Sequence, residues 1–138
     1  MTPLARIHLD PVGGIAGDMF VAAMADAFPQ CIPGLMKELA KLRKSPAVPG
    51  EGDSRFEPHA GSSLRGQRFV VDVGTDESHA QDHAAFRDIR TRLQAAGLDR
   101  RVLEHSLALF TLLAEAEGQV HGVAPDAVEF HELGAWDS

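Results

Sequence analysis

The chain has 138 residues, 44% hydrophobic and 24% charged, which is typical of one soluble globular domain. Its net charge of −7 argues against nucleic acid as a partner, and the single cysteine, Cys31, excludes an internal disulfide. No apolar run approaches the ~18 residues of a membrane span, and the N-terminus lacks a signal-peptide pattern, so we expect a cytoplasmic protein without a membrane partner.

The first predicted elements are a strand over residues 5–10 and a helix over residues 15–28, joined by a glycine-rich turn. Ile7 and Leu9 alternate with polar neighbours, as in a half-buried strand. The apolar residues expected on the inner face of the helix are Ile15, Met19, Phe20, Ala23, Met24 and Ala27. Pro29 ends this helix.

The glycine-rich turn between strand and helix is a candidate ligand site. A helix N-terminus reached through such a turn presents backbone N–H groups that can hold an anion, and Asp10 and Asp18 flank the turn. The spacing matches neither a dinucleotide fingerprint nor a P-loop. The alternative is that the glycines only allow a tight turn and close packing of the helix on the strand.

Further along, a second helix begins near Pro33 and buries a leucine and methionine stripe, and a proline- and glycine-rich connector covers residues 44–53. Residues 55–60 and 67–73 predict a hairpin, and residues 74–83 a polar loop.

Two more helices are predicted over residues 84–96 and 99–120. The first has Phe86, Ile89 and Leu93 inward and ends at Gly97. The second is capped by Asp99 and ends before Gly122. A short extended segment follows over residues 128–131. The expected fold is α+β, a small mixed sheet of three to four strands packed against about four helices.

Two histidine-containing segments are candidate metal ligands. His79 and His83 are four residues apart among acidic neighbours, a spacing that on a helix stacks two imidazoles on one face and suits nickel or zinc. His131 and Glu132 offer an imidazole and a carboxylate to a metal, or an acid and a base. The alternatives are a solvated polar loop for the first segment and a surface ion-pairing segment for the second.

The two ends of the chain resemble the nickel insertion proteins of nickel-pincer cofactor synthesis. The matching residues are Leu9–Asp10, the stretch G-I-A-G-D-M from Gly14 to Met19, and the stretch F-H-E-L-G-A-W-D-S from Phe130 to Ser138. In that family a histidine run often precedes a helix reading roughly Leu-x-x-Ile, which here stands as Phe86 to Ile89.

The resemblance implies a metal-handling function. The family inserts nickel into a sulfur-bearing pyridinium mononucleotide, in a reaction that depends on CTP and a divalent cation, Mn or Mg. By resemblance, the candidate metal ligands are His79, His83, His131 and Glu132, and the candidate ligand-binding residues are Asp10, Gly14, Gly17, Asp18 and Asp137.

The resemblance also implies a further region in the family. The pattern continues beyond Trp136–Asp137 into a C-terminal region that binds CTP. We therefore expect residues 1–138 to be the single N-terminal, nickel-handling domain of a longer architecture, incomplete for catalysis by itself. A homo-oligomer is left open, as are two other functions: a metal-storage module without enzymatic activity, and an anion- or nucleotide-binding domain that uses the glycine-rich turn.

Overall fold

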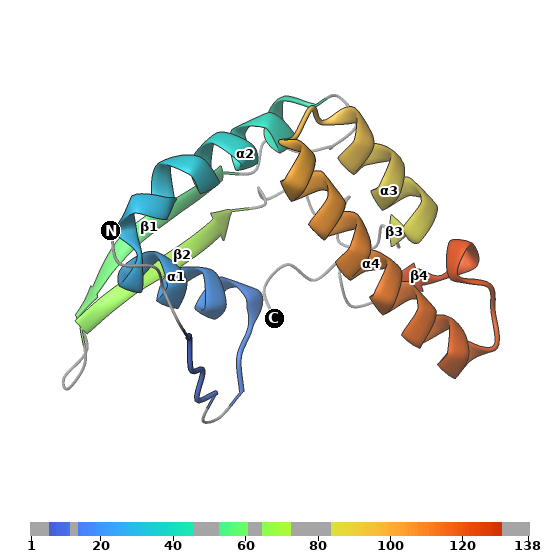
Figure 1. Cartoon of the computed structure of the whole chain (residues 1–138), viewed down its shortest axis with the longest axis horizontal. Coiled ribbons are helices and arrows are strands. Elements are labelled where there is room, and N and C mark those ends of the chain that lie inside the picture. Colours follow the sequence, from blue (N-terminus) through green and yellow to red (C-terminus); the bar gives the residue numbers. More distant parts are fainter. Residues whose placement is uncertain (1–5, 12–13, 46–52, 61–64, 73–83, 131–138) are drawn as a thin grey trace.

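The computed structural model describes residues 6–11, 14–45, 53–60, 65–72 and 84–130 (Figure 1). The elements are, in chain order, α1 (Gly17–Ala27), η1 (Pro29–Cys31), α2 (Ile32–Lys44), β1 (Asp53–Ala60), β2 (Arg65–Asp72), β3 (Ala84–Ala85), α3 (Phe86–Ala95), α4 (Arg100–His121), η3 (Pro125–Ala127) and β4 (Glu129–Phe130). The predicted α+β class is confirmed. The strands form two antiparallel pairs, β1 with β2 and β3 with β4.

The predicted strand over residues 5–10 is wrong for the part that the structure describes. Residues 6–11 form no helix or strand, and Ile7 and Leu9 each expose 49% of their surface. A strand requires a neighbour whose backbone N–H and C=O groups pair with its own. The four described strands pair with one another instead, so the alternation of Ile7 and Leu9 has no sheet to face.

Helix α1 forms as predicted but buries a different face. Ala22 and Ala25 are its buried residues, whereas Met19 and Phe20 expose 60% and 41% of their surface. The helix packs against β2, and small side chains let a helix lie close to the backbone of a strand. The predicted apolar face therefore lies mostly outside the interface with the hairpin.

The predicted hairpin is confirmed as β1 and β2. Phe56 lies directly opposite Phe69 in the register, with ring centroids 5.0 Å apart, and such cross-strand aromatic pairs stabilise a sheet. Phe69 is buried. The carboxylate of Asp53, at the start of β1, pairs with the guanidinium of Arg43 near the end of α2, which ties the hairpin to that helix.

A second core lies between α3, α4 and the pair β3–β4. It contains Phe86, Ala114, Val128 and Phe130, with Ile89 and Phe110 packed against it. The ring of Phe130 lies 6.5 Å from that of Phe86 and 6.3 Å from that of Phe110, measured between centroids. The inward face predicted for residues 84–96 is therefore confirmed.

The predicted helix ends are also confirmed in this part of the chain. The Asp99 carboxylate accepts a hydrogen bond from the N–H of Arg101 at 2.9 Å, so Asp99 is the N-cap of α4. Gly97 and Gly122 have φ of +65° and +68° after α3 and α4, the left-handed conformation in which glycine ends helices.

The molecule has the form of an arch (Figure 1). We call α1, α2, β1 and β2 the N-terminal limb, and β3, α3, α4 and β4 the C-terminal limb. Near the top of the arch, the Glu38 carboxylate of α2 accepts a hydrogen bond from the N–H of Asp99 at 2.8 Å. Each limb therefore packs mainly within itself, and Glu38 links the two limbs.

No single helix in the described part of the chain has the length and apolar character to span a membrane. One bent pair, α1 with η1–α2, meets the same criteria of length and composition only when both members are taken together.

Candidate functional site

The glycine-rich turn leads into α1 through a backbone that requires glycine at one position. Gly14 has φ of +102°, where a Cβ atom would be strained, and its N–H donates to the carbonyl of Pro11 at 3.1 Å. Ala16 is extended and occupies the N-cap position, and the N–H of Phe20 donates to its carbonyl. The turn thus reverses the chain and starts the helix at Gly17.

Asp18 lies in the first turn of α1, where a carboxylate is favoured by the helix dipole. Its Oδ1 atom accepts a hydrogen bond from the N–H of Met19 at 2.7 Å. The side chain is exposed, so its second oxygen remains accessible to a cation or a polar ligand.

The glycines of the turn are open to solvent. A Cβ atom built on Gly14 or Gly17 would have no heavy atom within 4 Å, and both residues are exposed. The alternative explanation for these glycines was close packing of the helix on a strand. The described contacts do not support it. Asp10 is also exposed, in the segment without regular secondary structure.

The candidate metal ligands lie outside the described residues. These are His79, His83, His131 and Glu132, and the candidate ligand-binding residue Asp137 lies outside as well. Within the described ranges, no group of three or more His, Cys, Asp or Glu side chains could hold a metal ion.

Two described histidines have local partners on α4. The Nδ1 atom of His105 lies 2.7 Å from the carbonyl of Arg101, and Nε2 of His121 lies 3.3 Å from the carboxylate of Glu117. Both rings are exposed.

A strand over residues 5–10 beside the segment ending at residue 131 would place the glycine-rich turn and the His131–Glu132 segment at one edge of a sheet. The structure removes this premise, because β4 pairs with β3 and residues 6–11 form no strand. Pairing of residues 6–11 with β4 therefore does not bring the two motifs together.

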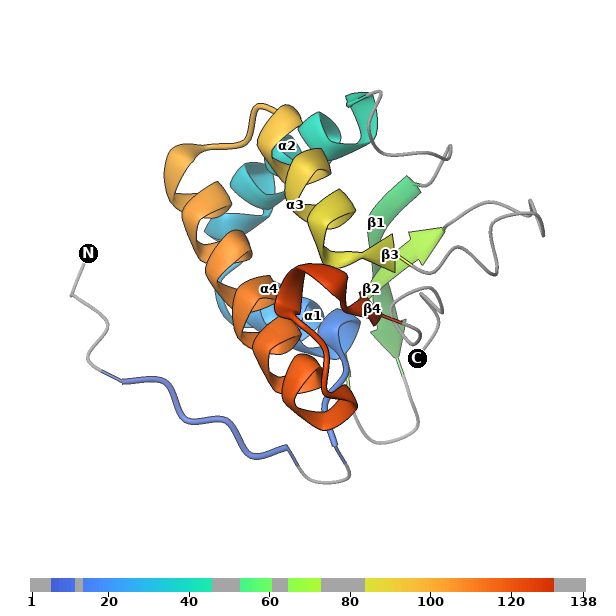
Figure 2. The same ribbon diagram turned by 90° about the vertical axis from the view of Figure 1, so that its right-hand side faces the viewer.

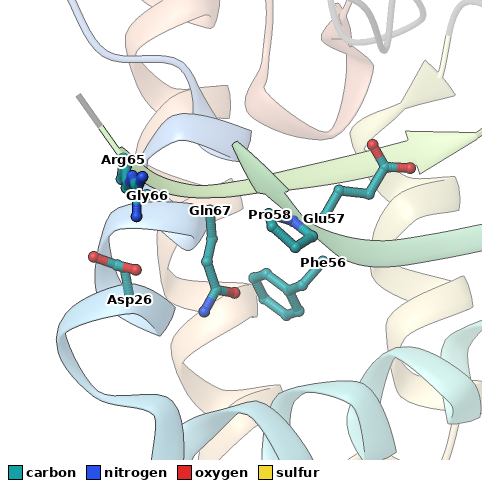
Figure 3. Close-up of a pocket in the computed structure, with 7 residues that line it drawn as sticks. All are labelled: Asp26, Phe56, Glu57, Pro58, Arg65, Gly66 and Gln67. Carbon is teal, nitrogen blue, oxygen red and sulfur yellow. The ribbon is translucent and has the colours of Figure 1, made fainter. Parts of the chain in front are cut away.

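A hollow of about 490 Å³ lies between α1 and the hairpin (Figure 3). Asp26 of α1 and Arg65 of β2 lie near one end, the amide of Gln67 points toward the ring of Phe56, and Glu57 points away from them. This hollow has a guanidinium and the Asp26 carboxylate near one end, and the apolar side chains of Phe56 and Pro58 in its lining. Sequence reasoning missed it because its residues come from three elements whose packing the periodicities do not specify.

A second, smaller hollow of about 230 Å³ lies beside β4, immediately before the His131–Glu132 segment. Its lining residues are His121, Val123, Ala127, Val128 and Glu129. His121, at the C-terminal end of α4, and Glu129, on β4, bring one imidazole and one carboxylate to this hollow.

Comparison with known proteins identifies the family. The sequence model described as nickel insertion protein matches residues 7–138, a range that contains both motifs. No solved structure matches the chain.

Three relatives illustrate the match. A pyridinium-3,5-bisthiocarboxylic acid mononucleotide nickel insertion protein of Akkermansia muciniphila is 40% identical over 135 residues, which cover 94% of this chain and 32% of the relative. Proteins described as nickel insertion proteins in Myxococcus xanthus and Wolinella succinogenes are 41% and 35% identical, each over 96% of this chain and 32% of the relative.

The chain thus spans about a third of the length of the curated relatives that it matches. The family model covers nearly the whole chain, and the resemblance noted at its two ends lies within that match. The chain therefore belongs to the nickel insertion protein family.

Proposed function

We propose that this chain is the nickel-handling, N-terminal part of a nickel insertion protein that acts on pyridinium-3,5-bisthiocarboxylic acid mononucleotide. The observation that carries the proposal is the continuous family match over residues 7–138, which includes the glycine-rich turn and the His131–Glu132 motif. The substrate comes from the name of the Akkermansia muciniphila relative.

The proposed ligands suit a protein that must hold nickel and then release it. Imidazole nitrogens and carboxylate oxygens bind Ni²⁺, while thiolate-type sulfur is a softer donor. In the proposal His79, His83, His131 and Glu132 hold Ni²⁺ before transfer. The sulfur atoms of the substrate then replace these ligands, which favours movement of the metal from protein to substrate.

The glycine-rich turn has a separate role in the proposal. Asp10, Gly14, Gly17 and Asp18, together with Asp137, contact the mononucleotide substrate. The exposed turn and the N–H groups at the start of α1 are suited to an anionic phosphate group. CTP and its Mn or Mg ion bind to the C-terminal region of the family architecture, which makes that region the partner of this chain.

The direct test is a reconstitution experiment. The purified chain is mixed with the C-terminal region of a relative, the mononucleotide, Ni²⁺, CTP and Mn²⁺, and the nickel-containing product is measured by mass spectrometry. We expect product from the complete mixture, and loss of product for His131→Ala and Glu132→Gln. A chain that binds nickel yet yields no product would be a storage module, and the proposal would be wrong.

Nickel binding by the chain alone provides a second test. We expect weak binding by titration calorimetry, further weakened in the double variant His79→Ala/His83→Ala. The control is His59→Ala/His105→Ala, which removes two histidines that are exposed in the structure. Equal affinity of wild type and the His79/His83 variant would remove this loop from the proposed site.

The exposed turn also supports a second candidate function, binding of a nucleotide or anion independent of nickel. It rests on the open space around Gly14 and Gly17. Protection of this turn from amide hydrogen exchange by CTP or phosphate in a metal-free sample would favour this candidate. Protection only by the pyridinium mononucleotide would favour the proposed function in nickel insertion.

A further inference from the structure

Helix α4 has a second apolar face that the chain itself leaves bare. Leu109, Leu112 and Val120 expose 69%, 64% and 79% of their surface, and Val102 and Leu113 each expose 38%. The inner residues of the same helix, Phe110 and Ala114, pack in the C-terminal limb core. Helix α4 therefore carries apolar residues on two faces, and only the face with Phe110 and Ala114 packs in the described core.

The exposed apolar residues lie along one face of the helix, with His105 between Val102 and Leu109. Val102, Leu109 and Ala116 are spaced by seven residues, and Leu112, Leu113 and Val120 lie three or four residues from them. Apolar residues at such three- and four-residue spacings line the seam of packed helix pairs. We call these six residues the α4 stripe. Figure 2 shows α4 at the left-hand edge of the group of helices, with α3 and the two short strands on its other side.

The area of the α4 stripe suits a symmetric contact. The five large side chains leave roughly 500 Å² of apolar surface exposed, at the upper end of what monomers tolerate in one patch. A twofold interface uses the same surface on both copies. Two stripes together with their polar flanks therefore reach the ~1,000 Å² that a specific interface requires.

The charges beside the stripe determine which partner and which orientation fit. Arg101 lies near the N-terminal end of α4 and Glu115 near its C-terminal end, and helical spacing places both on the same flank of the stripe. Both side chains are exposed, and no ion pair within the described residues engages either of them. In an antiparallel pair about a twofold axis, each Arg101 approaches Glu115 of the other copy.

A parallel pair would lose this charge complementarity. About a twofold axis parallel to the helices, the flank that carries Arg101 and Glu115 lies on opposite sides of the contact in the two copies, so neither residue meets its counterpart. The parallel pair would also align the two helix dipoles in the same direction, whereas the antiparallel pair places opposite helix ends side by side. The positions of Arg101 and Glu115 therefore favour the antiparallel orientation.

We propose that two copies of this chain associate through an antiparallel contact between their α4 stripes. The apolar side chains Leu109, Leu112 and Val120 supply the buried surface, and Arg101 and Glu115 select the orientation. This proposal is independent of the proposed reaction.

Oligomeric state in solution provides the test. Sedimentation equilibrium of the whole chain at several concentrations should show a reversible transition from 14.8 kDa to twice that mass. Leu109→Glu/Leu112→Glu should remain monomeric at every concentration. The matched control is Ile7→Glu, an exposed apolar residue outside the stripe, which should dimerise as wild type does.

Charge reversal tests the orientation and identifies the partner as a second copy. Arg101→Glu alone and Glu115→Arg alone should each weaken the dimer roughly three- to tenfold. The double variant Arg101→Glu/Glu115→Arg should restore the wild-type dissociation constant, because each altered residue again meets an unlike charge. Circular dichroism of each variant checks that α4 remains folded.

Several outcomes would overturn the proposal. These are a wild-type chain that stays monomeric at every concentration, a dimer that survives Leu109→Glu/Leu112→Glu, and a double reversal that fails to restore association. A stripe that instead binds the C-terminal region of a relative would also overturn it, since the occupant would then be a different partner.

Discussion

Gly118 lies close to other backbone atoms, whereas Gly17 lies in open space. At Gly118 of α4 a Cβ atom would lie 2.7 Å from the carbonyl oxygen of Val123, and the N–H of Val123 donates to the carbonyl of Gly118 at 3.0 Å. The chain leaving α4 thus folds back against the helix at this residue. At Gly17 the space around the backbone is open, so packing within the described chain does not require glycine there.

Gly118→Ala should destabilise the protein by about 1–3 kcal/mol, because the new methyl group displaces backbone atoms in a packed region. Urea denaturation measures the change in the free energy of unfolding. The control is Gly34→Ala in α2, where a Cβ atom meets nothing within 4 Å and alanine favours the helix by up to ~1 kcal/mol. Equal stability of the Gly118 variant and wild type would show that this close approach is not needed.

Gly17→Ala should separate stability from function. Alanine in the first turn of α1 should leave the stability unchanged or raise it by up to about 1 kcal/mol. If the turn contacts the mononucleotide as proposed, the methyl group should reduce product formation in the reconstituted reaction. Thermal melting and the product assay measure the two effects, and full activity of this variant would argue against backbone contact at Gly17.

At the scale of the elements, the start of α4 is fixed by two carboxylates. Asp99 caps its own helix through the N–H of Arg101, and Glu38 of α2 accepts from the N–H of Asp99 while pairing with Lys41 at 2.7 Å. The hydrogen bond from Lys41 and then that from the Asp99 N–H lower the pKa of Glu38 below its ordinary value of 4.5. The ionised form of Glu38 therefore stabilises the folded protein.

This lowered pKa predicts a pH-dependent contribution to stability. A carboxyl group whose pKa is lower in the folded state stabilises at pH values above its unfolded pKa. That contribution is lost as the pH falls through the lowered folded pKa. Glu38→Gln should therefore melt at a lower temperature than wild type at pH 7, and the difference should shrink as the pH falls below 4.5.

Melting temperatures of both proteins over a series of pH values measure this effect. The control is Glu129→Gln, which changes an exposed carboxyl group on β4. A difference between wild type and Glu38→Gln that stays constant from neutral to acidic pH would mean that ionisation of Glu38 does not stabilise the link between the limbs.

The whole molecule consists of two limbs with separate packing. The hairpin and α1 pack together in one limb, and α3, α4, η3 and the β3–β4 pair pack together in the other. Among the described residues, no large side chain is completely buried. Exposed apolar residues on α1 and α4 accompany this modest core.

Separate packing predicts that the limbs respond separately to mutation. Phe130→Ala should destabilise the C-terminal limb by about 3–5 kcal/mol, because it removes a buried ring from the core. Amide hydrogen exchange should then accelerate in α3 and α4, while the amides of β1 and β2 keep their rates.

The matched variant is Phe56→Ala, which removes the ring opposite Phe69 in the hairpin. It should accelerate exchange in β1 and β2 and leave α4 unchanged. Acceleration throughout the molecule in either variant would show that the two limbs unfold as one cooperative unit.

Helix positions and helix ends were determined by the sequence itself. Asp99, Gly97 and Gly122 act within a few residues of their own backbone, so their side-chain chemistry predicts the caps without knowledge of the fold. The hairpin of β1 and β2 was predictable for the same reason, because its strands are neighbours along the chain. The family could also be recognised from the sequence, since both motifs are continuous stretches of residues.

Contacts between residues that are distant in sequence were decided only by the tertiary structure. The alternation of Ile7 and Leu9 predicts a strand with two different faces. It does not reveal whether another strand pairs with this segment, so the sequence did not show that such a strand is lacking. The apolar periodicity of α1 did not reveal that Ala22 and Ala25 would face β2, because close approach favours small side chains over large ones. The bare side of α4 likewise follows from which of its two apolar faces the C-terminal limb covers, a choice that depends on packing in three dimensions.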